Sequence, residues 1–354
     1  MNRILLVKTS ALGDIVHTYP VVAYLRQKFP STQIDWVVET PFAGLVASHP
    51  EINQTLTIST KNWRKQLFSR ETWTAIAAFR SRLQQVTYDV VFDLQGNSKS
   101  GLITGLAKSP RKVGFALKTV PEWPNIFFTN KRLNPPIQGN IRQEYLSLVA
   151  SYFGETAPSA DSAVRLNITD DQLEMIAKVR QKAALHQTPM ILVCPGSAWR
   201  NKQLTTSTLR EFLGLIQSHT NAHLAFIWGS PDEKQTADEL HAAFPSHSQV
   251  VEKISLPMLQ NLMTMSDLVI AMDSLPLHLA GTTQTPTFSV FGASSAAKYK
   301  PFGDRHYAFQ GACPYSRTFE KRCPILRTCA TGACIRDLQA DSLFASFKRW
   351  WEEL

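Results

Sequence analysis

The stretch RILLVKTSALGDIVHTYP, residues 3–20, sets the expectation for the fold of the chain. Its apolar run at residues 4–7 predicts a buried strand, and the turn around Gly13 followed by a helical pattern predicts a strand-to-helix junction. Asp14 stands at that junction, where a carboxylate can cap the helix or take part in chemistry. Pro20 lacks an N–H and would disturb a helix that starts at Asp14, so we expect a kinked or separately positioned first turn.

The same alternation of apolar runs and amphipathic stretches continues along the chain. Continuous apolar strands with helices between them are typical of parallel sheets covered on both faces, so the sequence predicts an α/β fold. Residues 118–139 carry four prolines and no sustained period, and we expect an irregular excursion there. Further strands are expected at 34–38, 88–96, 190–197, 223–233, 266–274 and 285–294, and helices at 69–86, 142–153, 170–185, 208–219 and ending near 244.

The length of 354 residues exceeds one ordinary core and favours two domains. The polar stretch at residues 154–163 is the expected linker. We therefore predict doubly wound, Rossmann-like domains at 1–160 and 161–335. Residues 336–354 are expected to form a C-terminal helix that packs back on the first domain.

Charge is unevenly distributed between the two halves. Residues 1–165 hold 19 Lys/Arg against 11 Asp/Glu, an excess of +8, and residues 166–354 hold 18 against 17, an excess of +1. A basic half can attract nucleic acid, anionic lipid headgroups or a phosphorylated substrate, or it can simply aid solubility. The N-terminus lacks the apolar core of a signal peptide, and no run reaches the roughly 18–20 apolar residues of a membrane span. We expect a cytosolic protein, with a peripheral membrane position left open.

Two segments of the second half resemble anion sites at strand ends. CPGSAWRNK, residues 194–202, places Ser197 and backbone donors near Lys202, a combination suited to phosphate. AMDSLPLHLAG, residues 271–281, places Asp273 and Ser274 before a helix that can begin at Pro276. In open parallel sheets such strand ends are where ligands bind. Together with Asp14, the two segments outline a site for a nucleotide diphosphate.

The basic residues of the first half include a cluster with aromatic neighbours, TKNWRKQLFSR at residues 60–70. A phosphate-bearing acceptor would find bidentate and point-charge partners there, although each residue taken alone is more simply interpreted as a solvated charge. The residues considered for this role are Lys61, Arg64, Lys65, Arg70, Lys99, Lys131, Arg132 and Arg142.

His17 lies three residues beyond Asp14 on the same helix face. It could donate a hydrogen bond to Asp14 or to a bound ligand, or it could be a packed histidine.

Four of the five cysteines lie within 22 residues near the C-terminus: Cys313, Cys323, Cys329 and Cys334. A reducing cytosol argues against disulfides. The spacing lacks the paired CxxC of common zinc sites, so we expect no metal, with a structural zinc at these four cysteines as the less favoured alternative.

These motifs, in this order, resemble those of the family 9 glycosyltransferases, the bacterial heptosyltransferases of lipopolysaccharide assembly. The resemblance is carried by ILLVKTSALGDIVHTYPVV (4–22), IDWVVE (34–39), YDVVFDLQGNSKSG (88–101), FIWGSPDE (226–233), DLVIAMDSLPLHLAG (267–281) and TFSVFGAS (287–294). The opening motifs look most like heptosyltransferase I, whereas the cysteine-bearing tail is more like heptosyltransferase II. Leu275, where the family usually has glycine, and the shortened pattern after Lys202 depart from the family in the donor half.

The resemblance implies a GT-B fold, two Rossmann-like domains facing each other across a cleft, and an inverting transfer that needs no metal or cofactor. The implied donor is ADP-heptose, and the implied partner is a phosphorylated lipopolysaccharide precursor at the inner-membrane surface rather than a nucleic acid. Asp14 would be the general base. Donor-site residues would be Ser197, Lys202, Asp232, Glu233, Asp273, Ser274 and His278, and acceptor-site residues Ser10, Gly13, His17, Lys61, Arg64, Lys65, Lys99, Arg132 and Arg142.

Three alternatives stay open at this level. A family 9 transferase could use another nucleotide sugar or acceptor. A nucleotide-sugar epimerase shares the architecture, although the basic first half disfavours it. A catalytically silent protein that binds anions and membranes is the candidate from a different class.

Overall fold

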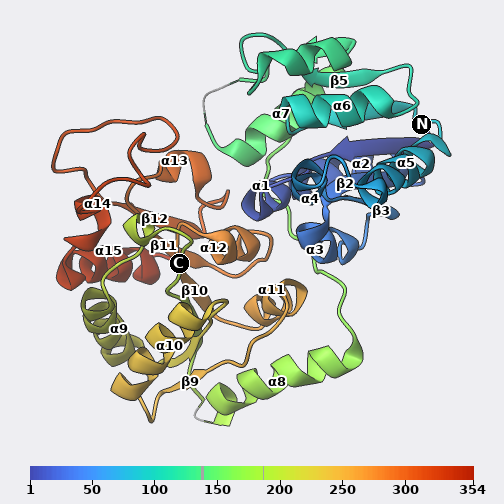
Figure 1. Ribbon diagram of the computed structural model, residues 1–354. Helices are drawn as coiled ribbons and strands as arrows, with labels where there is room; N and C mark the ends of the chain where they lie inside the picture. Colours follow the sequence, from blue (N-terminus) through green and yellow to red (C-terminus); the bar gives the residue numbers. More distant parts are fainter. Residues whose placement is uncertain (137–138, 186) are drawn as a thin grey trace. The chain divides into compact units, whose positions relative to one another are not determined.

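The computed structural model describes residues 1–136, 139–185 and 187–354, and the chain divides into two compact units, Met1–Ser162 and Ala163–Leu354 (Figure 1). Each unit contains a six-stranded sheet in which all neighbouring strands are parallel. The predicted α/β class is thus confirmed. Two positions of the expected irregular segment, 137 and 138, lie outside the described residues.

The sheet of the first unit has the strand order β3-β2-β1-β4-β5-β6, the common Rossmann order. Four of the five residues of its central strand β1, Ile4 to Val7, are apolar and buried. The order in which strands are added to the sheet reverses between β1 and β4, which are parallel, and a ligand site is expected at the carboxyl ends of these strands. The strands are β1 (Arg3–Val7), β2 (Gln33–Glu39), β3 (Gln54–Ile58), β4 (Val90–Asp93), β5 (Lys112–Phe115) and β6 (Lys131–Leu133).

Helices cover this first sheet, and Pro20 has the predicted effect. A first short helix ends at Val16, and the next begins at Tyr19 with Pro20 in its first turn, where no N–H is needed. The segment expected to be irregular instead contains a 3₁₀ helix and the edge strand β6. The helices are α1 (Leu12–Val16), α2 (Tyr19–Lys28), η1 (Thr40–Phe42), α3 (Ala43–Ala47), α4 (Thr60–Lys65), α5 (Arg70–Gln84), α6 (Ser98–Leu106), η2 (Trp123–Phe128) and α7 (Ile141–Tyr152).

The second unit repeats the Rossmann order, written from the other edge as β12-β11-β10-β7-β8-β9. Its reversal point lies between β7 and β10. The strands are β7 (Met190–Cys194), β8 (His223–Phe226), β9 (Ser248–Val250), β10 (Leu268–Met272), β11 (Thr287–Phe291) and β12 (His306–Gln310). The helices are α8 (Asp170–Leu185), η3 (Arg200–Lys202), α9 (Thr206–Thr220), α10 (Pro231–Ala243), α11 (Leu256–Thr264), α12 (Leu275–Ala280), α13 (Ala296–Tyr299), α14 (Ala333–Arg336) and α15 (Ala340–Glu352).

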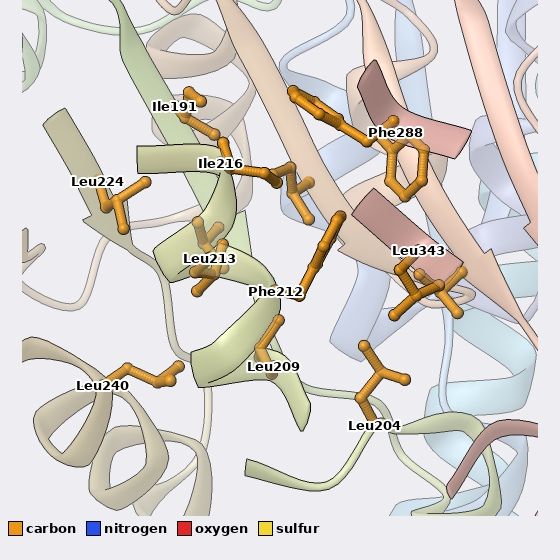
Figure 2. Packing of buried hydrophobic residues seen from close by; sticks show 14 of the residues in the cluster. Ile191, Leu204, Leu209, Phe212, Leu213, Ile216, Leu224, Leu240, Phe288 and Leu343 are labelled. Carbon is orange, nitrogen blue, oxygen red and sulfur yellow. The ribbon is translucent and has the colours of Figure 1, made fainter. Parts of the chain in front are cut away.

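Helix α15 packs within the second unit. Its apolar side packs into the core of the second unit, where the ring centroids of Phe347 and Phe288 lie 5.5 Å apart. Phe212 of α9 lies 5.5 Å from the ring of Phe288, and Figure 2 shows Leu343 of α15 beside the same group. The segment 336–354 contains α15, and the aromatic face of this helix is buried in the core of the second unit.

Candidate active site

The loop between β1 and α1 is held by the side chain of Gln95, which follows β4. Gln95 Oε1 accepts the backbone N–H groups of Thr9 and Ser10, each at 3.1 Å. The two loops that flank the reversal point of the first sheet are thereby tied together. Gly13 and Asp14 follow in the first turn of α1.

Asp14 is half-buried and occupies the third position of α1, so the interpretation of Asp14 as the N-cap residue is wrong. The N-cap is Ala11, whose N–H is accepted by Asp14 Oδ2 at 3.2 Å. One carboxylate oxygen thus helps to satisfy the start of the helix.

A buried lysine lies near Asp14 and has no role in the sequence-based prediction. Lys8 directly follows the apolar run of β1 and donates to the carbonyl of Leu94 at 2.9 Å and to the hydroxyl of Tyr145 at 2.8 Å. Burial lowers the pKa of Lys8, and the carboxylates of Asp14 and Asp93 partly offset this effect. A basic residue in a stretch that otherwise forms a core strand is the signal that could have identified it.

His17 and Arg142 are buried together. Arg142 Nε donates to His17 Nδ1 at 3.4 Å, so the interpretation of His17 as a packed histidine agrees with the structure. Burial lowers the pKa of Arg142 to about 10, and Asp161 opposes the shift. The expectation that Arg142 adds to an exposed basic surface is therefore wrong, because only 1% of the residue is exposed.

The remaining basic residues expected at the acceptor site lie in two separate regions of the first unit. Lys61, Arg64 and Lys65 are exposed on α4, and the neighbouring Lys99 forms a 2.8 Å ion pair with Glu39 at the end of β2. Glu39 also accepts the N–H of Thr60 at 3.1 Å, which ties the start of α4 to this strand end.

Arg132 does not lie near α4 and the end of β2. It is exposed on β6, the strand at the opposite edge of the sheet from β3, and donates to the carbonyl of Thr129. The expected acceptor residues are therefore only partly one cluster, because sequence proximity says nothing about strand order.

In the second unit, Lys202 and Asp273 form a buried ion pair across the reversal point. Lys202 Nζ lies 2.5 Å from Asp273 Oδ2, and His278 Nε2 lies 3.6 Å from the other carboxylate oxygen. Burial alone would raise the pKa of Asp273, but the charges of Lys202 and His278 outweigh it and the net shift is downward. Residues 71 positions apart in the chain are thus fixed together where β7 and β10 end.

Ser197 and Ser274 flank this pair. Ser197 Oγ donates to the carbonyl of Asp273 at 3.4 Å, and Ser274 is the N-cap residue of α12. Both are partly exposed, so their hydroxyls lie at the surface of the strand ends. The structure brings Ser197, Lys202, Asp273, Ser274 and His278 into one group.

Glu233 lies beside the loop after β7, although it follows β8 in the chain. Its Oε2 accepts the N–H groups of Gly229 and Ser230, which caps α10. A Cβ added to Gly196 would lie 2.1 Å from Glu233 Oε1, so the glycine allows this close approach. Asp232, in contrast, is exposed in the first turn of α10.

The four C-terminal cysteines line one small cavity of about 20 Å³, and all are free thiols. Burial raises the pKa of Cys334 to about 11, with the other three thiols adding to the shift. Within the described ranges, no three His, Cys, Asp or Glu side chains are arranged so that they could hold a metal ion. Likewise, no helix in these ranges is long and apolar enough to cross a bilayer.

Comparison with known proteins agrees with this architecture. A family model described as Glycosyltransferase family 9 (heptosyltransferase) matches residues 76–328. Lipopolysaccharide heptosyltransferase 1 of Escherichia coli (strain K12) is 27% identical over 308 residues, covering 85% of this chain and 91% of that protein. The protein of the same name from Pseudomonas aeruginosa is 27% identical over 323 residues, covering 91% and 87%.

Solved structures show the same fold. E. coli heptosyltransferase WaaC with ADP has a TM-score of 0.79 at 24% identity, covering 98% of this chain and 99% of that one. E. coli ADP-heptose lps heptosyltransferase II has a TM-score of 0.70 at 16% identity, with 100% of both chains covered. The predicted GT-B class, with two Rossmann-like domains, is confirmed. The chain belongs to glycosyltransferase family 9, the heptosyltransferase family, and is a glycosyltransferase.

Proposed function

We propose that this protein transfers a heptose from ADP-L-glycero-D-manno-heptose to the Kdo-containing inner core of lipopolysaccharide, with inversion at the anomeric carbon. The main support is that each Rossmann unit gathers polar residues where its central strands end. In the first unit Lys8 and Gln95 lie at the loop that carries Asp14, and in the second Lys202 is paired with Asp273. The relatives named lipopolysaccharide heptosyltransferase 1, matched over most of the chain, favour heptose and lipopolysaccharide as the substrate classes.

Asp14 is the proposed general base. Its carboxylate accepts the proton of the acceptor hydroxyl while that oxygen forms a bond to the anomeric carbon. The bond from this carbon to the diphosphate oxygen breaks in the same step, through an oxocarbenium-like state. The helix position of Asp14 fixes the carboxylate, since one oxygen already accepts the N–H of Ala11 and the other is available for the proton.

The second unit is the proposed donor site. Asp273 orients the Lys202 ammonium, which stabilises the negative charge that develops on the departing diphosphate. Ser197, Ser274 and His278 lie around this pair and would supply further polar groups, and Glu233 and Asp232 are the proposed contacts to the nucleoside or sugar. With a lysine supplying the positive charge, this mechanism requires neither a metal nor a cofactor.

The acceptor site is proposed around the β1–α1 loop, with Ser10 and Gly13, and along the start of α4. Lys61, Arg64 and Lys65 would contact phosphates of the acceptor, and Lys99 lies near the same strand end through its pair with Glu39. Because the acceptor is a membrane lipid, the protein would work at the cytoplasmic face of the inner membrane as a peripheral protein.

The decisive experiment is incubation of the purified protein with Kdo-lipid A and a panel of ADP-, UDP- and GDP-sugars. Mass analysis should show a heptose added only with ADP-heptose. Addition of a different sugar would identify another family 9 transferase. Conversion of the donor without any acceptor would indicate an epimerase, and no turnover with any pair would favour a silent binding protein.

A further inference from the structure

An exposed apolar turn joins α4 to α5 in the first unit. Phe68 has a relative exposure of 103%, and Leu67 beside it and Trp73 on α5 have 48% and 59%. We call these three residues the apolar turn. Grouped exposed apolar side chains of this size commonly mark a contact surface, because leaving them in water is unfavourable.

Hydrogen bonds give this turn a defined shape. The N–H of Ser69 donates to the carbonyl of Gln66 at 3.0 Å, and Ser69 Oγ accepts the N–H of Thr72 at 3.4 Å as the N-cap of α5. The Trp73 indole donates to the carbonyl of Leu67 at 2.8 Å. Phe68 is therefore presented by a structured connection between two helices.

The same segment has a second, inward-facing anchor. Trp63 of α4 packs against the core of the first unit, with its ring centroid 6.2 Å from that of Phe79 on α5. One aromatic residue thus fixes the segment to the core, while Phe68 and Trp73 face solvent. Phe68 is therefore exposed on a segment, from α4 to α5, that is itself fixed to the core of the first unit.

Charge indicates what kind of partner fits the apolar turn. Lys61, Arg64 and Lys65 precede it on α4, Arg70 follows it, and Glu71 is the one acidic residue between positions 60 and 75 of the sequence. Exposed aromatic and aliphatic side chains flanked by lysine and arginine are the pattern of elements that lie in the interface of anionic bilayers. A protein partner with a matching acidic rim is the competing occupant.

We propose that the apolar turn inserts into the headgroup boundary of an anionic lipid bilayer, while the flanking basic residues contact lipid phosphates. This inference rests on the proposed function in that the acceptor is a membrane lipid, so that docking would hold the first unit beside it. Insertion removes Phe68 and Leu67 from water, and the basic residues add an attraction that salt screens. The two contributions can therefore be separated by experiment.

The test is co-sedimentation of the full-length protein with vesicles of phosphatidylcholine alone or mixed with phosphatidylglycerol, without donor or acceptor. Wild-type protein should bind the anionic vesicles more tightly than vesicles of phosphatidylcholine alone. Phe68→Ser should weaken binding to the anionic vesicles by about 10- to 100-fold, because the burial of one phenylalanine side chain is lost. Phe68→Trp should retain binding. The matched control is Met175→Ser, which alters a 46% exposed apolar residue on α8 of the second unit and should change nothing.

Two outcomes would overturn the proposal. One is equal vesicle binding by wild type and Phe68→Ser. The other is a loss of self-association on Phe68→Ser, measured by analytical ultracentrifugation, with vesicle binding unchanged, which would make the turn a protein interface. Transfer to a deacylated, water-soluble acceptor is measured separately. Phe68→Ser should retain this transfer, so failed docking and failed heptose transfer are distinguishable.

Discussion

The ammonium of Lys8 donates a hydrogen bond to the hydroxyl of Tyr145 at 2.8 Å, joining the end of β1 to α7 across 137 positions of the chain. The same ammonium lies 4.3 Å from the centre of the Tyr145 ring. Both groups are buried, so few water molecules can replace the phenol as a partner of the charge. The strand end that carries the Asp14 loop is thereby fixed to a helix on the sheet.

Removing this hydroxyl should destabilise the first unit measurably. Tyr145→Phe loses a hydrogen bond to a charged group, and we expect the free energy of unfolding to fall by about 1.5–3 kcal/mol. Tyr19→Phe is the matched control, because the Tyr19 hydroxyl donates to the neutral carbonyl of Leu45 at 3.2 Å. That variant should lose only about 0.5–1.5 kcal/mol. Urea unfolding measures both, and equal losses would show that the charge of Lys8 is irrelevant.

Asp14→Ala should separate chemistry from binding. General-base catalysis typically contributes about 10²- to 10⁴-fold, so kcat should fall by that factor while the Kd for ADP-heptose stays near the wild-type value. Product formation and calorimetric titration with the donor measure the two quantities. Wild-type turnover in this variant would leave Asp14 with only its structural bond to the N–H of Ala11.

Asp273→Asn should destabilise the second unit and weaken donor binding. Breaking a buried ion pair typically costs about 3–5 kcal/mol, because Lys202 would keep its charge without the carboxylate. The control is Asp238→Asn, which removes an exposed pair with Lys234 and should cost about 0.2–1 kcal/mol.

The effect of Asp273→Asn on stability should depend on pH. The pKa of Asp273 is lowered below 3.8 in the folded protein, so its contribution to stability is present above that pH and is lost as the pH falls through the lowered pKa. The difference in unfolding free energy between wild type and Asp273→Asn should therefore shrink below about pH 3.8. A difference that stayed constant across that range would contradict the assignment.

Gly196→Ala and Gly214→Ala should have opposite effects on stability. The new methyl group at Gly196 would displace Glu233 from the cap of α10, which we expect to cost about 0.5–2 kcal/mol and to weaken donor binding. At Gly214, inside α9, the nearest atom is 3.9 Å away, and alanine should stabilise the helix by about 1 kcal/mol. Thermal unfolding and donor titration measure both variants, and wild-type behaviour of Gly196→Ala would show that Glu233 can move without consequence.

The central strands and most helices were predictable because their signals are local. Strand β1 is four buried apolar residues in a row, and the break before α2 follows from a single proline. Five strands were not predicted: β3, β5, β6, β9 and β12. Four of them lie at sheet edges, and short segments such as KRL in β6 or SQV in β9 carry little apolar pattern and are defined by pairing with a neighbour. The packing of α15 in the core of the second unit was not predictable, because an amphipathic pattern shows that a helix has an apolar face but does not identify the surface that covers it.

The sequence by itself determined the fold class, the family likeness and the residue types at the strand ends. Tertiary structure decided which of those residues meet. The sequence assigned Lys202 and Asp273 to one site, but only the structure shows that they form a direct ion pair. Strand order carries Arg132 to the opposite edge of its sheet from β3, which the chain spacing does not suggest. The fold also buries Arg142, which was expected to be an exposed charge, and buries Lys8 near Asp14. The physical reason is that a charge has its chemical meaning only once its solvent exposure and its partners are fixed, and both depend on contacts between distant parts of the chain.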